Sequence, residues 1–414
     1  MGPGPRERTS GAGPSSQAGC SRLSSGPEKQ VQHSPAVLPD RRRSTVPWPE
    51  RSVLLVGVRG HGGEEVYCRL LCDHPPDGVR YSATLGFHAS CSGARCLSGR
   101  ERILNRLVHP WAAPDQGFRV LSLDDSFDLV HIHTHPTVLN GLKERPVVFS
   151  AGSSHYHYLR DYEGWSEARI RRRYNRARTV FPALGVIDSL LTHSRVTIAY
   201  TFSEYGRAPY LAWGVPRSKI RVLYPGFDIP HPRPASADRD VRFLFLGRNP
   251  RRKGGDLVLE AFQELRRACP AARLVYATDD PPESPIGGVD AIPLVPHEHV
   301  GALFGSCDVF VSPTRAEGFG FTNVEAQGFG LPVISTRVGA IPEVVEHGKT
   351  GVLVEPGDAT GLLVAMRQLA EDPSLIQEMA VAARERFEER FSLSVFQRGL
   401  RAIYEEALDR SVSG

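Results

Sequence analysis

The chain has 414 residues, of which 41% are hydrophobic and 23% are charged, with a formal net charge of +4. This length suffices for two domains of ordinary size, and so small a net charge argues against a nucleic-acid partner. No apolar run approaches the roughly 18 residues of a membrane-spanning helix, and the N-terminus lacks a secretory apolar core, which favours a cytoplasmic location. The seven cysteines show no Cys-x2-Cys pairs, so we expect reduced thiols.

The first 49 residues differ in composition from the rest of the chain. They contain eight prolines, many serines and glycines, and few aliphatic side chains. Such a segment cannot bury enough apolar surface to offset the entropy of ordering it. We therefore predict a disordered tail over residues 1–49.

From Arg51 onward, strand-like runs alternate with helical patterns, which predicts α/β domains with parallel sheets. A first domain is expected over residues 50–225 and is followed by a proline-rich linker at 226–238. Its expected strands are Val53–Gly57, Asp128–His133, Pro146–Ser150, Thr197–Thr201 and Ile220–Tyr224. A second domain is expected over 239–390, with a closing helix at 391–414.

The second domain begins with an apolar strand pattern over residues 241–247. The helix predicted after it places four apolar side chains at core-facing spacing: Val258, Ala261, Phe262 and Leu265. The closing helix repeats this spacing with Phe396, Leu400, Ile403, Tyr404, Ala407 and Leu408. Both patterns predict helices packed against a sheet.

An arginine-rich helix is expected in the first domain. Arg169, Arg172, Arg173 and Arg176 share one face, and aromatic residues precede them. The simplest interpretation is a solvated basic face. Contact of the Arg169–Arg178 helix with an anionic membrane or a phosphorylated acceptor stays open as a peripheral interaction.

Two carboxylates eight positions apart flank a glycine turn in the second domain. A strand ending at Pro313 leads to the turn, and a helix is expected to start near Phe321 or Thr322 and to end between Gly328 and Pro332. The amides and positive dipole end of a helix start form an anion site. Glu325, one turn inside the helix, can accept ribose hydroxyls, and Glu317 is assigned to the ligand's other end. A plain surface turn is the alternative.

These residues resemble the E-x7-E region of retaining glycosyltransferases, particularly glycosyltransferase family 4. The resemblance implies a GT-B architecture, in which two Rossmann-like domains face each other across a cleft and a terminal helix returns to the first domain. It also implies that Glu317 contacts the donor sugar and Glu325 the ribose. Backbone amides would hold the sugar and diphosphate at Gly318, Phe319, Gly320, Phe321 and Thr322.

A second motif matches the same family. Arg248 directly follows the strand at 241–247, and Lys253 comes five positions later. By the resemblance, both grip the donor diphosphate, where fixed cations stabilise the negative charge of the leaving group. With two cations and a helix start, we expect no metal and no cofactor apart from a UDP- or GDP-linked sugar as co-substrate. A solvated basic loop is the alternative.

The first domain carries a glycine pair, Gly62 and Gly63, in its first strand-to-helix turn. It resembles the pair that approaches the donor phosphates in this family, and Glu65 matches a frequent acid after the pair. The glycine spacing does not fit a nicotinamide-binding fingerprint, whereas a plain tight turn stays possible. The family often has a histidine after the strand at Pro146–Phe149. This chain offers His155 or His157 from the next loop, as sugar or acceptor contacts, or neither.

His131, His133 and His135 alternate along one strand, which places them on one face. Together with His155 and His157 they could ligate zinc. No cysteine or carboxylate ligands complete such a set, and histidines at the end of this strand are common in the family, so we predict no metal site.

The sequence thus predicts a retaining glycosyltransferase that moves a sugar from a nucleotide-sugar donor to a hydroxyl of a glycan, lipid-linked or small-molecule acceptor. Its expected location is cytoplasmic or membrane-peripheral. Two alternatives stay open: a nucleotide-sugar epimerase or hydrolase of the same fold, and a non-catalytic subunit that binds sugar nucleotides.

Overall fold

The computed structural model confirms an α/β protein with two six-stranded parallel sheets. It describes residues 48–57, 63–85, 119–123, 126–134, 137–140, 144–152, 155–183, 186–187, 195–230 and 240–412. The predicted tail lies outside these residues except for 48 and 49, and the predicted linker lies outside them except for 226–230. Each sheet and its helices form one lobe.

The N-terminal lobe is built on a sheet of strand order β2-β1-β4-β6-β8-β9. Its strands are β1 (Arg51–Gly57), β2 (Val79–Leu85), β4 (Leu129–His133), β6 (Val147–Ala151), β8 (Val196–Thr201) and β9 (Ile220–Val222). Its helical segments are α1 (Gly63–Asp73), α3 (His155–His157), the π-helical turn η2 (Tyr158–Tyr162), α4 (Glu167–Ala183), α5 (Glu204–Ala212) and the short η3 (Arg217–Lys219). All five strands predicted for this domain are confirmed.

A second, three-stranded sheet in this lobe was not predicted. It consists of β3 (Arg119–Ser122), β5 (Thr137–Asn140) and β7 (Val186–Ile187). Strands of two to four residues carry too little periodicity to be found in a sequence. The π-helical turn η2 was missed for the same reason.

The C-terminal lobe has the strand order β12-β11-β10-β13-β14-β15. Its strands are β10 (Arg242–Gly247), β11 (Arg273–Thr278), β12 (Val289–Pro293), β13 (Val309–Ser312), β14 (Val333–Thr336) and β15 (Gly351–Val354). Its helices are α6 (Pro250–Lys253), α7 (Gly255–Ala268), α8 (His297–Gly305), α9 (Phe321–Gly328), α10 (Ile341–Val344), α11 (Ala359–Glu371) and α12 (Pro373–Arg390). Counted from β10, the order is that of a dinucleotide-binding fold.

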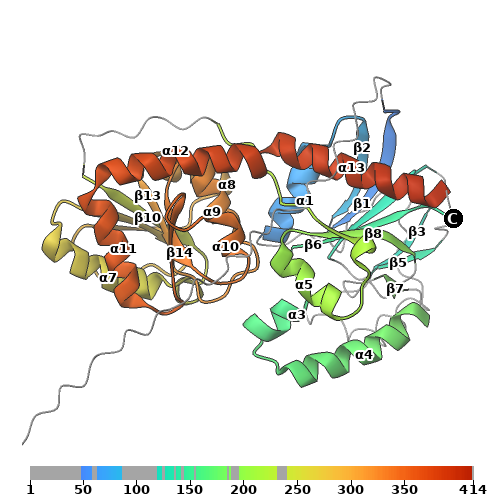
Figure 1. The fold of residues 1–414 in the computed structure, drawn as a ribbon, viewed down its shortest axis with the longest axis horizontal. Helices are drawn as coiled ribbons and strands as arrows, with labels where there is room; N and C mark the ends of the chain where they lie inside the picture. Colours follow the sequence, from blue (N-terminus) through green and yellow to red (C-terminus); the bar gives the residue numbers. More distant parts are fainter. Residues whose placement is uncertain are drawn as a thin grey trace, which may run out of the picture. The chain divides into compact units, whose positions relative to one another are not determined.

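Apolar side chains alternate along the C-terminal sheet, which is covered on both faces. Phe243 and Phe245 of β10 pack under α7 and α11, which lie together on one face (Figure 1). Leu244 and Leu246 face the opposite side, toward a core that includes residues of α8 and α9. This burial on both faces explains the continuous apolar run of the strand.

Two distant segments pair where the chain passes between the lobes. The N–H of Phe227 donates to the carbonyl of Phe391 at 2.9 Å, and the N–H of Leu393 donates to the carbonyl of Phe227 at 2.9 Å. Helix α13 (Leu393–Val412) follows and packs against β6 and β8 of the N-terminal sheet (Figure 1). Five of the six apolar residues that the sequence placed on its core-facing side are fully buried.

Two further properties follow from the described residues. In these residues, no helix combines the length and the apolar character that crossing a bilayer requires. The thiols of Cys68, Cys72, Cys269 and Cys307 are not joined in disulfide bonds, as predicted for them.

Candidate functional site

The two motifs found in the sequence meet at one point of the C-terminal sheet. β10 and β13 are adjacent, and the strand order runs outward from them in opposite directions. Ligands of open α/β sheets bind at such a switch point, beyond the carboxyl ends of the strands. Residues 248–253 follow β10 and residues 313–320 follow β13, so both loops lie there.

The turn after β10 is fixed by its own side chains. Asn249 caps α6 by accepting a hydrogen bond from the N–H of Arg252 at 3.1 Å, and Pro250 occupies the first helical position. Gly254 ends the turn with φ of 76°, and a Cβ there would lie 2.2 Å from the carbonyl oxygen of Pro313. This position therefore accepts only glycine, and the turn aims Lys253 toward the loop after β13.

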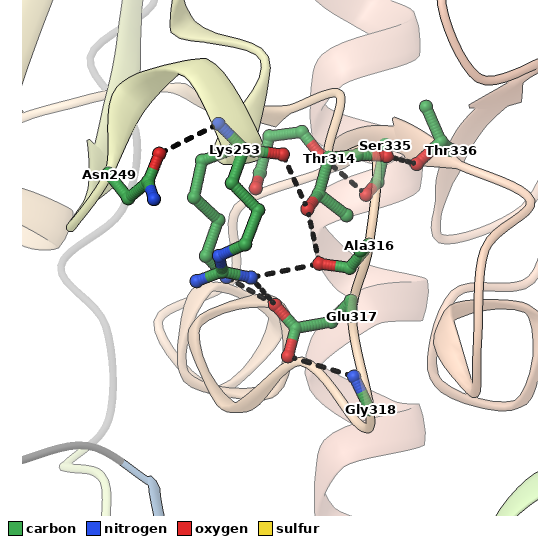
Figure 2. A network of polar contacts seen from close by, with 10 residues as sticks. Asn249, Lys253, Thr314, Ala316, Glu317, Gly318, Ser335 and Thr336 are labelled. Atoms are coloured by element: carbon green, nitrogen blue, oxygen red, sulfur yellow. Dashed lines mark hydrogen bonds and ion pairs between the residues drawn. The ribbon is translucent and has the colours of Figure 1, made fainter. Parts of the chain in front are cut away.

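The Lys253 ammonium and the Glu317 carboxylate form an ion pair at the centre of the site (Figure 2). Their side chains are 11% and 15% exposed. Glu317 Oε1 also accepts a hydrogen bond of 3.2 Å from the N–H of Gly318. Arg252 adds a second cation, because its Nη1 lies 3.6 Å from Glu317 Oε2 and donates to the carbonyl of Ala316 at 2.8 Å.

These partners set the charge of Glu317. Burial raises the pKa of its carboxyl, because the charged form loses solvation. The charge of Lys253, then that of Arg252, and the hydrogen bond from Gly318 outweigh burial and bring the pKa below its ordinary value. Glu317 is therefore a carboxylate at neutral pH, which accepts hydrogen bonds from hydroxyl groups and does not donate a proton.

Neighbouring segments hold this loop in place. Thr336 Oγ1 donates to the carbonyl of Thr314 at 2.6 Å, and Thr314 Oγ1 donates to the carbonyl of Arg252 at 3.2 Å (Figure 2). At Gly339, φ is 61° and a Cβ would lie 1.9 Å from the carbonyl oxygen of Glu317. The carboxylate is thus presented by a rigid turn.

Helix α9 starts beside this ion pair, at the position that the sequence predicts. Gly320 takes the N-cap position with φ of 90°, and no side chain caps the helix there. The first backbone N–H groups of a helix have no partner within it, so those of Phe321 and Thr322 are available to an anion. The Phe319 and Phe321 rings pack in an aromatic cluster with Phe202, which leaves their backbone as the polar part.

Glu325 lies one turn further along α9 and has a partner that the sequence did not reveal. His297 Nε2, at the start of α8, lies 3.3 Å from Glu325 Oε1. The hydrogen bond to Glu325 raises the pKa of His297, although partial burial opposes the shift. The histidine is exposed and the carboxylate nearly buried, so a ligand that takes the carboxylate can displace the ring.

Arg248 stands apart from this network. It follows the last residue of β10 and is exposed. In the described part of the chain it forms no ion pair, whereas Lys253 and Arg252 both face Glu317. The structure therefore places one predicted cation in a protein ion pair and leaves the other open to a ligand.

The glycine pair of the N-terminal lobe is only partly described. Gly62 lies outside the described residues, whereas Gly63 begins α1. A Cβ at Gly63 would lie 2.5 Å from the Phe321 ring, so this glycine approaches the start of α9. Glu65 bonds to Arg69 on its own helix at 2.8 Å, while Glu64, which the sequence did not single out, bonds to His133.

The zinc alternative is not supported by the described histidines. His131 Nδ1 bonds to Tyr404 at 2.7 Å and its Nε2 to Ser150 at 2.8 Å, and burial lowers its pKa well below the ordinary value. His133 uses its two nitrogens for Ser150 and Glu64. Among the described residues no group of His, Cys, Asp and Glu could hold a metal ion, and His135 lies outside them.

Two candidate histidines follow β6, and the side chain of one of them is described. The His155 side chain lies outside the described residues, although its backbone begins α3. His157 is buried and stacks on Tyr205 with ring centroids 3.8 Å apart. Burial, followed by the charge of Arg160, lowers the pKa of His157 to about 4, so its ring is neutral at physiological pH.

The arginine-rich helix has the two faces that the sequence predicts. Ile170, Tyr174 and Ala177 of α4 are buried. Arg169 lies over the Trp165 ring at 3.7 Å, on the other face. Membrane contact through this face stays a prediction.

Glu343 of α10 is a residue that sequence reasoning missed. Its carboxylate accepts hydrogen bonds of 2.8 Å from the N–H groups of Glu204 and Tyr205, the first two residues of α5, and one of 3.0 Å from the Tyr224 hydroxyl. A carboxylate at a helix start is stabilised by the helix dipole. Glu343 thus links α5 of the N-terminal lobe to the segment that follows Gly339.

Comparison with known proteins agrees with this geometry. Residues 240–372 match the family model described as glycosyl transferases group 1. A GDP-mannose-dependent alpha-(1-6)-phosphatidylinositol monomannoside mannosyltransferase of Mycolicibacterium smegmatis is 29% identical over 261 residues, which are 56% of this chain and 63% of that protein. The chain thus matches less than two thirds of the length of this relative.

Solved structures share the fold over most of the chain. The sucrose-phosphate synthase of Thermosynechococcus elongatus superposes with a TM-score of 0.60 at 16% identity, covering 87% of this chain and 100% of that one. The Anabaena protein HepE, solved in complex with UDP-glucose, gives 0.58 at 17% identity, covering 86% and 100%. The chain therefore has a GT-B fold, and its residues 240–372 are similar to the glycosyl transferases group 1 family.

Proposed function

We propose that this protein is a retaining glycosyltransferase that moves a sugar from a nucleotide-sugar donor to an acceptor hydroxyl. The ion pair of Lys253 and Glu317 beside the uncapped start of α9 carries this proposal. It joins a cation, a carboxylate and free amides at a switch point, which suits a ligand with phosphate and hydroxyl groups. The glycosyl transferases group 1 match over the same residues supports it.

Each group has a role in binding the donor. The diphosphate lies between the open guanidinium of Arg248, the Lys253 ammonium and the first amides of α9. Glu325 accepts hydrogen bonds from the ribose hydroxyls once the His297 ring is displaced. Glu317 accepts hydrogen bonds from hydroxyls of the sugar. The carboxylates suit these roles because both are nearly buried and Glu317 is ionised.

The chemical step follows from this placement. When the sugar–phosphate bond breaks, negative charge moves to the leaving diphosphate, and fixed cations and helix amides stabilise it. The acceptor hydroxyl attacks the sugar from the face on which the diphosphate leaves, and the leaving phosphate takes the proton of that hydroxyl. The sugar therefore keeps its anomeric configuration, and no nucleophile from the enzyme is needed. The proposal needs no metal, and transfer that survives chelation by EDTA would support this part.

A thermal-shift panel identifies the donor. The panel comprises UDP, GDP, UDP-glucose and GDP-mannose, because the relatives act on or bind such molecules. A ligand that binds the native state raises the melting temperature. We expect one base to stabilise the protein, and Glu325→Ala to abolish this shift. Absence of any shift with every nucleotide would contradict the proposal.

A transfer assay with the selected donor then tests the reaction. Product should form only when an acceptor pool is present, with the anomeric configuration of the donor retained. Turnover of the donor alone would instead indicate an epimerase or a hydrolase. Donor binding without turnover in any acceptor pool would indicate a non-catalytic subunit.

A further inference from the structure

An aromatic turn of the N-terminal lobe reaches the same carboxylate. The π-helical turn η2 ends at Tyr162, a residue that is 42% exposed. The Arg252 guanidinium carbon lies 5.6 Å from the centre of the Tyr162 ring, and the same guanidinium lies 3.6 Å from Glu317. Arg252 therefore contacts both the Tyr162 ring and the Glu317 carboxylate. π-Helical turns are rare and are often found at functional sites.

The polar tip of Tyr162 points to the same place. The phenol of Tyr162 interacts electrostatically with the Glu317 carboxylate and with the backbone of Gly318. Burial and then the charge of Glu317 raise the pKa of Tyr162 to about 12, so the hydroxyl keeps its proton. A protonated phenol can donate one hydrogen bond and accept another. The phenol and the Glu317 carboxylate thus offer complementary groups close to one another.

This turn is anchored. Arg160 Nη2 donates to Asp161 at 3.0 Å and to the Tyr205 hydroxyl at 2.8 Å, and that hydroxyl donates to Asp161 at 2.7 Å. The backbone N–H of Tyr205 donates to Glu343, in the segment that follows Gly339. The N–H of Ala340 in that segment donates to the carbonyl of Gly318 at 3.2 Å. Hydrogen bonds therefore connect the turn that carries Tyr162 with the Glu317 loop, and selective recognition requires such rigidity.

We propose that Tyr162 is a specificity-determining residue that binds a hydroxyl of the transferred sugar through its own hydroxyl. This inference rests on the proposed function, which places the sugar beside Glu317. Binding sites that hydrogen-bond a substrate hydroxyl discriminate strongly against analogues without it, because their polar groups are then left unpaired. Tyr162 therefore selects the sugar, whereas Arg248 and Lys253 hold the diphosphate that all donors share.

Tyr162→Phe and Tyr162→Ala test the inference, with Tyr158→Phe as the matched control. Tyr158 stacks on Tyr162 at 5.7 Å in the same turn, but its hydroxyl donates to Glu163 at 3.0 Å. We expect Tyr162→Phe to lower kcat/KM for the preferred donor by about 10- to 100-fold. For deoxy-sugar donors that lack the recognised hydroxyl, the same substitution should lower kcat/KM much less. The affinity for the free nucleoside diphosphate should stay unchanged. Tyr158→Phe should behave like the wild type.

A second measurement needs no acceptor. In the wild type, the nucleotide sugar should raise the melting temperature more than the free nucleoside diphosphate does, and Tyr162→Phe should narrow this difference. If the wild type responds to no nucleotide, the proposed function itself fails. If the wild type responds and both Tyr162 variants keep its kcat/KM, its sugar selectivity and its melting difference, only the role of Tyr162 is overturned.

Discussion

The two lobes have related parallel sheets but use their polar residues in opposite ways. On the N-terminal sheet, His131, Ser150 and His133 form a buried chain of hydrogen bonds that runs from Tyr404 of α13 to Glu64 of α1. These groups satisfy one another. In the C-terminal sheet, an exposed arginine and the uncapped start of α9 lie at the switch point without such partners. The comparison indicates which polar groups serve folding and which are available to a ligand.

Removal of both cations at the C-terminal switch point should have the largest effect. We expect Arg248→Ala/Lys253→Ala to lower kcat/KM by at least about 10²- to 10³-fold, because the loss of even one group that stabilises developing charge costs this much. The measurement is transfer with the donor found in the thermal-shift panel, on protein whose circular dichroism matches the wild type. Near-normal transfer by this double variant would show that the cations of the C-terminal lobe do not serve the reaction.

The rigid turn that presents Lys253 should be the next most sensitive feature. Gly254→Ala combines a left-handed backbone with overlap at Pro313, so we expect a loss of roughly 2–4 kcal/mol in unfolding free energy. Gly357→Ala is the matched control, because its φ is 83° and nothing lies within 4 Å of a Cβ there. That variant should lose only about 1 kcal/mol. Equal losses in urea unfolding would show that the contact with Pro313 does not matter.

The buried chain of the N-terminal lobe should affect stability and not catalysis. Tyr404→Phe removes the partner of His131 Nδ1 and of the Tyr81 hydroxyl, each at 2.7 Å. Buried groups left without partners should cost about 1–3 kcal/mol of unfolding free energy. Transfer per folded molecule should stay within about twofold of the wild type. A large drop in kcat with unchanged stability would instead assign this chain to the reaction.

The smallest expected effect is a pH dependence of donor binding. In the free protein, the hydrogen bond to Glu325 raises the pKa of His297. A ribose that hydrogen-bonds to Glu325 breaks this bond and lowers the pKa again. Binding then releases a proton, so affinity should weaken a few-fold as pH falls through the raised pKa of His297 in the free protein, and it should level off below about 6.5, the ordinary histidine pKa. Isothermal titration across pH checks this slope, and His297→Gln should flatten it. An equal pH dependence of donor affinity in the wild type and in His297→Gln would show that His297 does not contribute to ribose binding.

Local structure was largely predictable from the sequence. The apolar runs of β1, β4, β6, β8 and β10 indicated their positions, and the glycines and proline around α9 indicated its bounds. The motifs were also recognisable, because Glu317, Glu325, Arg248 and Lys253 lie at fixed spacings within their own loops.

The partners of these residues could not be predicted. Lys253 and Glu317 are 64 positions apart, and only the pairing of β10 with β13 brings them together. His297 and Tyr162 reach the site from a helix start and a π-helical turn that have no periodic signature. Contacts of this kind depend on strand order and on single side-chain directions, which a pattern of residue types does not contain.

The position of Tyr404 has a consequence for synthesis. Its hydroxyl completes the hydrogen bonds of His131 and of Tyr81, which precedes it by 323 positions. While the ribosome makes the C-terminal sheet, the N-terminal sheet already has all its strands but not α13. His131 and Tyr81 then lack this partner, and the face of the sheet that α13 shares with α1 is only partly covered. The lobe that emerges first can therefore mature only after translation has passed Tyr404, which makes long-range closure a late and slow step of folding.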